Sequence, residues 1–539
     1  MKKIKTLIAL LLVAALCLAL FAACSSTKEG TETPSSSSSS TENKPSENKP
    51  AENKPEESKP EETSEPETYD PEDYTNLVMN FFDLRMTAAD NSAHIVDAIN
   101  EYIGPKYGLQ VAITYYTISD WMTKVQLSLG SGERIDVCEL GFGNGVGTLY
   151  TNTMIMDITD IAPENCPAAM EIMGPYLDAY KYDGRLYGIP TNRGLCTNNY
   201  VIMRKDILEE IGMLEEGENL HSWSGFEEIL KVVAEKYKDT GFFALGNGSG
   251  SSNSPAYFYD GDDWSTLVQW DSLGDTTAMT MSDANGNVSW YMDDPRYVDK
   301  LEMVVRWKEE GLLYPDSAID TTHGDELMKQ NVQFASMQEA EYGVETTKES
   351  NCGYPLVCPM YAPGWVMTST LTKSGVGVPI TAEEPEAACR FIDVLYTDEY
   401  VMNLLIRGQE GVDYRLENGE VIYDVKPTGA YYYEGDFLCG NNLLIHPVQG
   451  QGADYFEQIK KINDNAHVSE YLGFVFDNGE LQNLIANITA VSDQYSKDFA
   501  CGNYTPEKLA EAKAKYEAGG VREYLAEMQR QLDAWMASK

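Results

Sequence analysis

Few residues of this chain have the types and spacing that catalysis needs. The sequence contains no Gly-x-Ser-x-Gly turn, no His-Glu-x-x-His zinc motif, no phosphate-binding P-loop and no Cys-x-x-Cys pair. Its five histidines are scattered without ligand spacing, and the glycines of 141–147 miss the Gly-x-Gly-x-x-Gly spacing of a dinucleotide site. A carboxylate pair for glycoside hydrolysis stays open, because among 85 Asp and Glu residues any pair is expected by chance. We therefore expect that the protein is not an enzyme and that it binds no metal ion and no cofactor.

Aromatic and polar loop residues suggest a different chemistry, the binding of a sugar. The chain has 34 Tyr and 8 Trp. Sugars present apolar C–H faces and polar rims, so their sites combine flat aromatic side chains with amide, carboxylate and guanidinium groups. Runs that mix these types follow several predicted strands, where α/β proteins hold their ligands. The candidate ligand-binding residues are Arg85, Phe142, Asn144, Asn192, Arg193, Asn247, Trp264, Glu339, Tyr342, Trp365 and Tyr432.

The elements that position these loops alternate between strands and helices. Apolar runs predict strands, and apolar residues at helical spacing predict helices. We expect the helix from His94 to end at Gly104-Pro105, and Ser224 with Glu227 to cap a later helix. This alternation predicts parallel sheet covered by helices on both faces. The predicted strands are 77–84, 109–115, 135–140, 186–190, 200–203 and 332–337, and the predicted helices are 94–102, 121–129, 206–212, 226–236, 298–307 and a terminal region from Thr505-Pro506.

The N-terminus indicates export. Lys2, Lys3 and Lys5 precede an apolar run from Leu7 to Phe21 that is too short to span a membrane comfortably. Small residues then precede Cys24, which is typical of a bacterial lipoprotein signal. We expect residues 1–23 to be a signal peptide and Cys24 to carry the lipid; the alternative is an ordinary signal with a chance cysteine.

Residues 24–74 have the composition of a tether. From Ser25 to Asn76 the chain contains no Leu, Ile, Val or Phe, so it cannot bury enough apolar surface to offset the entropy of ordering. Tandem Glu-Asn-Lys-Pro units start at Glu42, Glu47 and Glu52. Proline at this frequency favours polyproline II, in which about 50 residues reach at most ~150 Å.

Length and charge limit the remaining classes. A chain of 539 residues is too long for one ordinary domain. A formal net charge of −45 argues against general affinity for nucleic acid or anionic lipid, because phosphate groups would be repelled.

The stretch from Tyr182 to Asp206 carries a family resemblance. Asp183 to Pro190 reads Asp-Gly-Arg-Leu-Tyr-Gly-Ile-Pro, and Met203 to Gly212 reads Met-Arg-Lys-Asp-Ile-Leu-Glu-Glu-Ile-Gly. Both resemble motifs of the extracellular solute-binding proteins of ABC importers, the class with maltose- and oligosaccharide-binding members, although methionine before Arg-Lys-Asp is a departure. Residues 366–371 and 385–398 resemble a strand and a helix of the same class, and residues 408–414 and the C-terminal region resemble its larger lipoprotein subgroup.

The resemblance implies a fold and a function. The fold would be α/β, two-lobed and periplasmic-binding-protein-like, with a hinge and extra C-terminal helices. Its lobes would be discontinuous, residues 75–192 with 339–395 and residues 193–338 with 396–539. The protein would be a lipid-anchored monomer on the outer face of the bacterial membrane that delivers an oligosaccharide to the transmembrane subunits of a permease. A peptide or other polar solute, a surface glycoside hydrolase and a polysaccharide adhesin remain alternatives.

Eight cysteines remain after Cys17 leaves with the signal and Cys24 is lipidated. Cys138 falls in a predicted strand and Cys389 on an apolar helix face, so both are expected to be buried. Cys352 and Cys358 flank a Gly-Tyr-Pro turn and either bridge or remain free thiols.

Overall fold

The computed structural model describes residues 68–83, 92–117, 120–141, 145–248, 255–424 and 437–539. All of them belong to one compact unit that spans 65–539. The predicted signal peptide, Cys24, and the candidate ligand residues Arg85, Phe142, Asn144 and Tyr432 lie outside the described residues.

Five strands form the first sheet, in the order β2-β1-β3-β17-β6. The first three are parallel and come from the apolar runs of the N-terminal part, while β17 runs antiparallel to both of its neighbours. The carboxyl ends of β1, β2 and β3 therefore lie at one edge of the sheet. The chain also leaves β6 at this edge, because β6 runs in the same direction. The strands are β1 (Thr75–Asp83), β2 (Leu109–Thr117), β3 (Val137–Glu139), β6 (Ile189–Pro190) and β17 (Gly375–Gly377).

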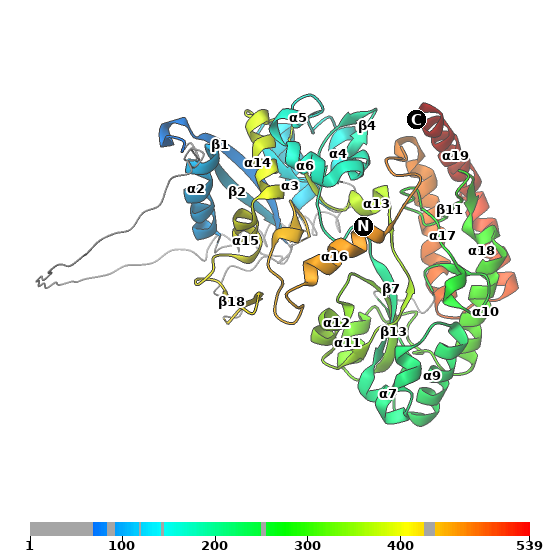
Figure 1. Ribbon diagram of the computed structural model, residues 1–539. Coiled ribbons are helices and arrows are strands. Elements are labelled where there is room, and N and C mark those ends of the chain that lie inside the picture. Colours follow the sequence, from blue (N-terminus) through cyan, green and yellow to red (C-terminus); the bar gives the residue numbers. More distant parts are fainter. Residues whose placement is uncertain (1–67, 84–91, 118–119, 142–144, 249–254, 425–436) are drawn as a thin grey trace, which may run out of the picture. The chain divides into compact units, whose positions relative to one another are not determined.

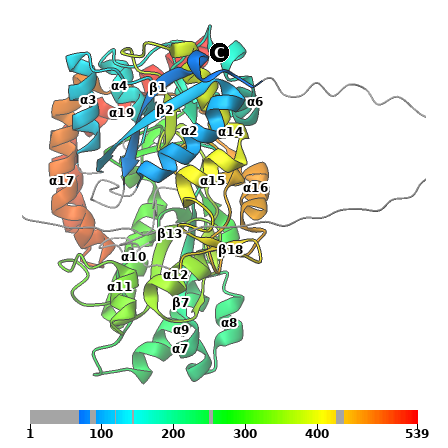
Figure 2. The ribbon, with the colours of Figure 1, turned by 90° about the vertical axis from the view of Figure 1, so that its left-hand side faces the viewer.

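Four helices pack around this sheet: α2 (Ala93–Tyr107), α3 (Trp121–Ser131), α14 (Pro385–Thr397) and α15 (Glu399–Arg407). α2 and α3 contact β2, α14 contacts β1, and α15 contacts α2. Figure 2 shows α2 and α15 side by side. Their apolar faces and the strands share one continuous core, which defines the first lobe.

The first helix continues past the predicted stop at Gly104-Pro105. Pro105 removes one helical hydrogen bond, but α2 continues to Tyr107. Gly108, at φ 66°, then closes the helix by donating its N–H to the Gly104 carbonyl. A Cβ on Gly104 would lie 2.6 Å from the Tyr74 ring, so glycine permits this packing. The described globule thus begins with Tyr69 and Tyr74 against α2, earlier than the predicted boundary at Thr75.

The second sheet has the order β14-β7-β13-β8, with β15 also paired to β7. Every residue of β7 is buried, and alternate side chains enter two different cores. Val201 and Met203 lie in one core and Tyr200 and Ile202 in the other, as the two-residue period of a strand requires. The strands are β7 (Asn198–Arg204), β8 (Phe243–Leu245), β13 (Gln333–Ala340), β14 (Leu356–Val357) and β15 (Met360–Ala362).

Helices cover both faces of the second sheet, which defines the second lobe. One core contains side chains of α7 (Lys205–Ile211), α9 (Trp223–Lys236) and α10 (Pro295–Glu309). The other contains side chains of α11 (Gly324–Lys329) and α12 (Val344–Cys352). Figure 1 shows β7 and β13 between α9 and the α11–α12 pair. The predicted α/β architecture of two helix-covered sheets is confirmed. The prediction of parallel sheet holds for β2-β1-β3 and for β8 with β13. It is wrong for β17 and for β7, which pairs antiparallel with β13, β14 and β15.

The capping residue of α9 differs from the prediction. Ser222, not Ser224, accepts a hydrogen bond from the Gly225 N–H and caps the helix. Ser224 instead donates its hydroxyl to Asp262, which also accepts its N–H. The helix begins at Trp223, three residues before the predicted start at Phe226, because Trp223 already belongs to the core.

Three C-terminal helices, α17 (Gln482–Ala500), α18 (Pro506–Ala518) and α19 (Val521–Ser538), add a further layer. They share a core with α10 and the hairpin β11–β12, beside which they lie in Figure 1. Thr505 caps α18 by accepting the Lys508 N–H, with Pro506 in the first turn, as predicted.

The chain crosses between the lobes at different places from those predicted. β13, expected to lead back to the first lobe from Glu339, is paired along its length with β7 of the second sheet. The return falls between β15 and β17. After α14 the chain stays with the first lobe, because Tyr396, Val401 and Leu438 belong to its core.

The remaining elements are short connections. They are the helices α4 (Gly145–Thr151), α5 (Ala162–Asn165), α6 (Pro167–Met173), α8 (Leu214–Glu218), α13 (Thr368–Leu371) and α16 (Tyr455–Asn465), the 3-10 helices Pro71–Asp73, Gly174–Tyr180, Trp264–Thr266, Tyr291–Asp293, Asn442–Leu444 and Gly479–Leu481, and the strands β4 (Lys181–Tyr182), β5 (Arg185–Leu186), β9 (Phe258–Tyr259), β10 (Leu267–Val268), β11 (Thr280–Ser282), β12 (Val288–Trp290), β16 (Trp365–Val366), β18 (Arg415–Glu417), β19 (Glu420–Ile422) and β20 (His467–Val468).

The eight cysteines of the described chain are buried free thiols, including Cys352 and Cys358, for which a bridge had stayed open. Burial raises the pKa of Cys352 to about 12, so this thiol stays protonated at neutral pH. Among the described residues, the helices lack the length and apolar content that a membrane span requires.

Candidate functional site

A hollow of about 380 Å³ lies where the two sheet edges meet. We call it the inter-sheet hollow. Its volume falls in the ~300–1,000 Å³ range of small-molecule sites. Both edges contribute to it, and so does the face of α16. The lining residues are Arg193, Gly194, Glu339, Ala340, Glu341, Tyr342, Val344, Thr347, Lys348, Phe437, Asn442, Gln451, Tyr455, Phe456 and Ile459.

Arg193 forms the polar floor of this hollow. It follows β6, and its guanidinium donates to the Ser374 hydroxyl at 3.1 Å and to the Thr370 carbonyl at 3.5 Å, both in the first lobe. Its Nη1 reaches Glu341 of the second lobe at 2.9 Å. With its side chain only 12% exposed, the guanidinium is fixed between the two lobes.

The charges of Arg193 and Glu341 also act on Cys196, which lies three residues beyond Arg193. Burial and, to a smaller extent, the Glu341 carboxylate raise the pKa of the Cys196 thiol, the Arg193 guanidinium opposes them, and the resulting pKa is about 11. The thiol is therefore neutral near pH 7 and adds no charge beside the hollow.

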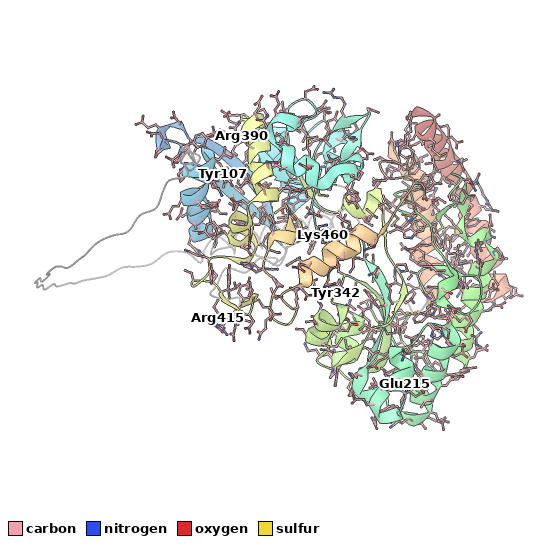
Figure 3. All side chains as sticks on the ribbon, viewed as in Figure 1. Tyr107, Glu215, Tyr342, Arg390, Arg415 and Lys460 are labelled. Atoms are coloured by element: carbon pink, nitrogen blue, oxygen red, sulfur yellow. The ribbon has the colours of Figure 1, made fainter. Side chains whose placement is uncertain are left out.

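An aromatic wall stands beside these charges. Tyr342 follows β13 and is 38% exposed, and its ring lies 5.8 Å from that of Tyr455, the first residue of α16. The Tyr455 hydroxyl donates to the Tyr342 carbonyl at 3.2 Å. Gly343 is required between them, because it has φ 73° and a Cβ there would lie 2.9 Å from the Tyr455 ring. Figure 3 shows Tyr342 beside α16.

Phe437 contributes a third ring. The Arg193 guanidinium carbon lies 5.9 Å from its centroid, within the range of a cation–π contact. Aromatic faces and a fixed cation thus line the same hollow.

Asn442 is the most unusual residue of the site. It is 2% exposed and lines the hollow, yet among the described residues neither its Nδ2 nor its Oδ1 has a hydrogen-bond partner. Its backbone is held, since its N–H donates to the Asn192 carbonyl at 2.8 Å. A buried amide without partners costs free energy, so a polar group that enters the hollow would be stabilised by this donor and acceptor.

Asn192 holds this segment to the first sheet. Its Nδ2 donates to the Asn441 Oδ1 at 2.9 Å, and its N–H donates to the Gly440 carbonyl at 3.0 Å. The amide of Asn192 is therefore a positioning group for Asn442, and it does not line the hollow.

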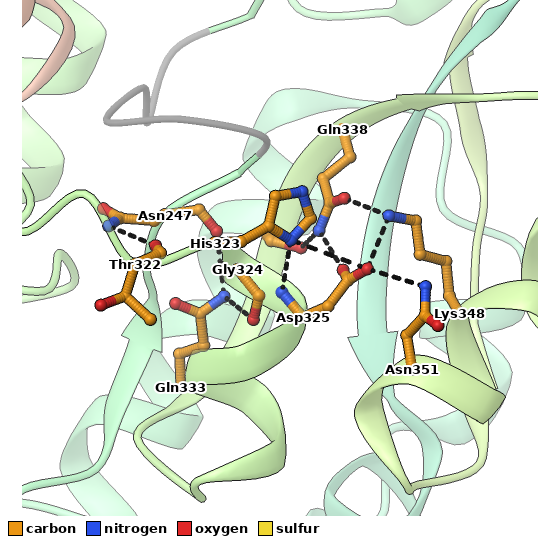
Figure 4. A network of polar contacts seen from close by, with 10 residues as sticks. Asn247, Thr322, His323, Gly324, Asp325, Gln333, Gln338, Lys348 and Asn351 are labelled. Atoms are coloured by element: carbon orange, nitrogen blue, oxygen red, sulfur yellow. Dashed lines mark hydrogen bonds and ion pairs between the residues drawn. The ribbon is translucent and has the colours of Figure 1, made fainter. Parts of the chain in front are cut away.

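Lys348 extends the wall toward a polar network in the second lobe, drawn in Figure 4. Its ammonium donates to Asp325 at 2.8 Å and to the Gln338 carbonyl oxygen, and Gln338 in turn donates to the second Asp325 oxygen at 2.8 Å. Burial raises the pKa of Asp325, but hydrogen bonds from Lys348 and Gln338 outweigh it and hold this pKa below its usual value. The Asp325 side chain is thus an ionised carboxylate that holds the Lys348 ammonium in place.

Three further candidates lie elsewhere. Asn247 is fully buried, and its Nδ2 braces the Asp320 and Thr322 carbonyls at 2.9 and 3.1 Å, as Figure 4 shows for Thr322. Trp264 is 6% exposed and packs 5.2 Å from Trp223 in the core of the second lobe. The structure therefore gives both residues structural roles, because loop residues next to a sheet are also used to close its core. Trp365 is half-buried against His467, 4.1 Å between ring centroids, and outside the hollow.

The hollow brings together Arg193, Glu339 and Tyr342 of the predicted set. The sequence argument did not select Asn442, Phe437, Tyr455 or Lys348. Glu341 lies between the selected residues Glu339 and Tyr342, and Lys348 follows them on α12, but the other three come from two distant segments, 437–442 and α16. Aromatic and amide residues at Phe437, Asn442 and Tyr455 were the available signal.

The arrangement is suited to binding polar ligands. It has rings for apolar C–H faces, the buried amide of Asn442, and the carboxylate of Glu339, which accepts the Thr197 hydroxyl. Among the described residues there is no cluster of three or more His, Cys, Asp or Glu side chains that would hold a metal ion.

Comparisons with known proteins point the same way. Residues 94–409, more than half of the chain, match the family described as bacterial extracellular solute-binding protein. Residues 470–537, which include the C-terminal helices, match a domain of unknown function.

One curated relative and several solved structures are similar over most of the chain. A protein of Streptococcus pneumoniae named carbohydrate ABC transporter substrate-binding protein is 22% identical over 466 residues, which are 84% of this chain and 89% of the relative. The N-glycan transport solute-binding protein NgtS of Streptococcus pneumoniae aligns with a TM-score of 0.72 at 18% identity, covering 86% of this chain and 99% of that one. The substrate-binding protein FusA of Streptococcus pneumoniae, in complex with kestose, aligns with a TM-score of 0.56 at 14% identity. The alignment covers 86% of this chain and 100% of the FusA chain.

Proposed function

The chain belongs to the family of bacterial extracellular solute-binding proteins, and from this premise we propose that it captures an oligosaccharide for an ABC importer. The ligand would enter the inter-sheet hollow and be handed to the transmembrane subunits of a permease. The protein would act as a monomer and perform no catalysis.

The observation that carries the proposal is the composition of the hollow. Tyr342, Tyr455 and Phe437 supply aromatic rings next to the buried amide of Asn442, which has no partner within the described ranges. A polyhydroxylated ring satisfies both kinds of surface at once, with C–H faces on the aromatics and hydroxyls that donate to Oδ1 and accept from Nδ2. The curated relative is named for carbohydrate transport, which supports the same ligand class.

Capture is proposed to work by relative motion of the two lobes. Arg193 is held by Ser374 and Thr370 of the first lobe and pairs with Glu341 of the second. A ligand that contacts both edges would favour the arrangement in which both sets of contacts form, and a permease would recognise that arrangement.

The membrane anchor is part of the proposal. Cleavage before Cys24 and lipidation of its thiol would hold the protein on the outer face of the membrane, with residues 25–67 as the spacer. Mass spectrometry of the N-terminal peptide from a membrane fraction tests this. A diacylglyceryl mass on Cys24 is expected, and an unmodified thiol there would contradict the anchor.

Calorimetric titration of the purified protein tests the ligand class. The probes are maltotriose, kestose, Man5GlcNAc and a tripeptide of similar size. We expect one saccharide family to bind with a stoichiometry of one and no product to form on prolonged incubation. Binding of the tripeptide alone would move the proposal to peptide uptake, and release of shorter sugars would identify a hydrolase.

A further inference from the structure

A second and larger hollow, of about 650 Å³, lies between α2 and α15 of the first lobe. We call it the α2–α15 hollow. It is bounded by these helices, by residues 408–414 and by His446, and it shares no lining residue with the inter-sheet hollow. The function proposed above does not use it.

Its walls contain an exposed aromatic platform. Tyr400 on α15 is 48% exposed, and its ring lies 4.7 Å from the ring of Tyr102 on α2. One edge of the Tyr400 ring therefore packs on protein while the rest faces the hollow, an arrangement that stacking on a ligand ring requires.

Asp398 fixes this platform. Its carboxylate is 4% exposed and accepts the Lys106 ammonium at 2.8 Å, the Tyr107 hydroxyl at 2.6 Å and the Tyr102 hydroxyl at 3.1 Å. The Lys106 ammonium is also 4.5 Å from the Tyr102 ring centroid. The Lys106 ammonium and the buried Asp398 carboxylate neutralise each other, so neither group requires a charged ligand.

The polar groups that remain are of the kind that bind hydroxyls. Tyr414 is 7% exposed and lines the hollow, and its hydroxyl makes no hydrogen bond to any residue within the described ranges. Burial raises the pKa of Tyr414 to about 12, so the hydroxyl is a donor at neutral pH. The carboxylates of Glu399 and Glu410 and the amide of Gln409 line the same space and supply acceptors.

We propose that the α2–α15 hollow is a second saccharide-binding site, in which Tyr400 stacks on a sugar ring and Tyr414 with Glu410 binds its hydroxyls. Its volume lies within the ~300–1,000 Å³ range of small-molecule sites. The site would hold glycan on the surface of the first lobe, separately from the solute in the inter-sheet hollow.

Fluorine NMR of the full chain tests the proposal at the residue concerned. One sample carries 3-fluorotyrosine at position 400, and a second carries it at position 342 in the inter-sheet hollow. Maltotriose, kestose and Man5GlcNAc are titrated to about 10 mM, which detects even weak sites. We expect at least one saccharide to shift the resonance at position 400 along a saturable curve.

Variants separate the two sites. Tyr414→Phe removes only a hydroxyl, and Glu410→Gln removes only a charge, so both are expected to fold while weakening the position 400 titration about fivefold or more. Asn442→Leu, in the other hollow, should leave that titration unchanged. A shift at position 342 without one at position 400 would overturn the second site and leave the importer function standing. A shift at position 400 without one at position 342 would support the second site and contradict saccharide binding in the inter-sheet hollow.

A matched control guards against general saccharide effects. Tyr69 is 49% exposed, as open as Tyr400, and does not line either hollow. Its 3-fluorotyrosine resonance should not move. Equal shifts at positions 69 and 400, or no shift at position 400 with any probe, would contradict the proposal.

Discussion

Arg193 and Glu341 form an ion pair, 2.9 Å between Nη1 and Oε1, that joins the edge of the first sheet to the end of β13 in the second. Arg193 leaves β6 where the chain first crosses between the lobes, and Glu341 follows the strand next to β7. Because the Arg193 side chain is also bonded to Ser374, the pair links the two lobes through a fixed guanidinium.

A double-mutant cycle on this pair measures the link. Arg193→Ala, Glu341→Ala and the double variant are expected to give a coupling free energy of about 1–2 kcal/mol in urea unfolding, because the guanidinium is mostly buried. The same cycle in saccharide affinity should show coupling of the same sign.

The matched control is the exposed pair Lys460–Asp464 on α16, whose side chains are 63% and 59% exposed. Its coupling is expected at about 0.5 kcal/mol or less, because solvent screens it. Equal coupling for both pairs would contradict a structural role for Arg193.

Asn442→Leu should separate stability from binding. The replacement has a similar volume and removes two buried polar atoms that have no partner in the described part of the chain, so the ligand-free protein is expected to gain about 1 kcal/mol of unfolding free energy. Affinity for the saccharide should fall about tenfold or more, because the ligand loses both hydrogen bonds. Thermal unfolding and calorimetry of the same samples check this. A less stable variant with unchanged affinity would show that the amide is structural.

Trp264 and Trp365 are expected to respond differently to alanine. Trp264 is 6% exposed in a core, so Trp264→Ala should cost about 3–5 kcal/mol of unfolding free energy. Trp365 is half-buried beside His467 and lies outside the inter-sheet hollow, so Trp365→Ala should cost about 1 kcal/mol or less. The sequence-based prediction that Trp365 contacts the saccharide requires this variant also to bind more weakly. Urea unfolding and calorimetry measure both effects. Unchanged affinity in Trp365→Ala would limit the site to the inter-sheet hollow.

Glu227 gives the second lobe a defined pH dependence. Burial disfavours its carboxylate, but hydrogen bonds from Arg306, Lys231 and Trp307 outweigh burial and lower its pKa from 4.5 to about 2. A depressed pKa contributes stability above the unfolded value that is lost as pH falls toward the folded value. We expect about 2 kcal/mol from this group at pH 7, lost between about pH 4.5 and pH 2.

Glu227→Gln tests that window. Urea unfolding at neutral pH should show the variant to be less stable than the parent, and the difference should shrink as pH falls through this range. A difference independent of pH would mean that packing around Trp307, and not the charge of Glu227, is responsible.

Much of the fold follows from local patterns. Apolar runs located β1, β2 and β7, and the Thr505-Pro506 start of α18 was read correctly, because each depends on side chains near in sequence. The errors arose where distant contacts decide. Proline at 105 did not end α2, since Tyr74 packs on Gly104 and Gly108 supplies the cap. β13 was assigned to the return crossing because its pairing with β7 has no signature in its own residues.

The site was harder to predict than the fold. Arg193, Glu339 and Tyr342 were selected because they stand beside the chain crossings, and the structure places them in one hollow. Asn247 and Trp264 have the same residue types in the same kind of loop, yet one braces backbone carbonyls and the other fills a core. Asn442 and Tyr455 come from segments more than 90 residues beyond Tyr342, and only the folded chain brings them to it.

The most direct test of the central claim is the affinity of one saccharide for the parent protein and for Tyr342→Ala, measured by calorimetry after the probe panel has identified a ligand. The importer proposal predicts binding to the parent with a stoichiometry of one in the inter-sheet hollow, weakened at least about tenfold by the loss of the Tyr342 ring. Unchanged affinity in Tyr342→Ala, or failure of every saccharide to bind the parent protein, would contradict it.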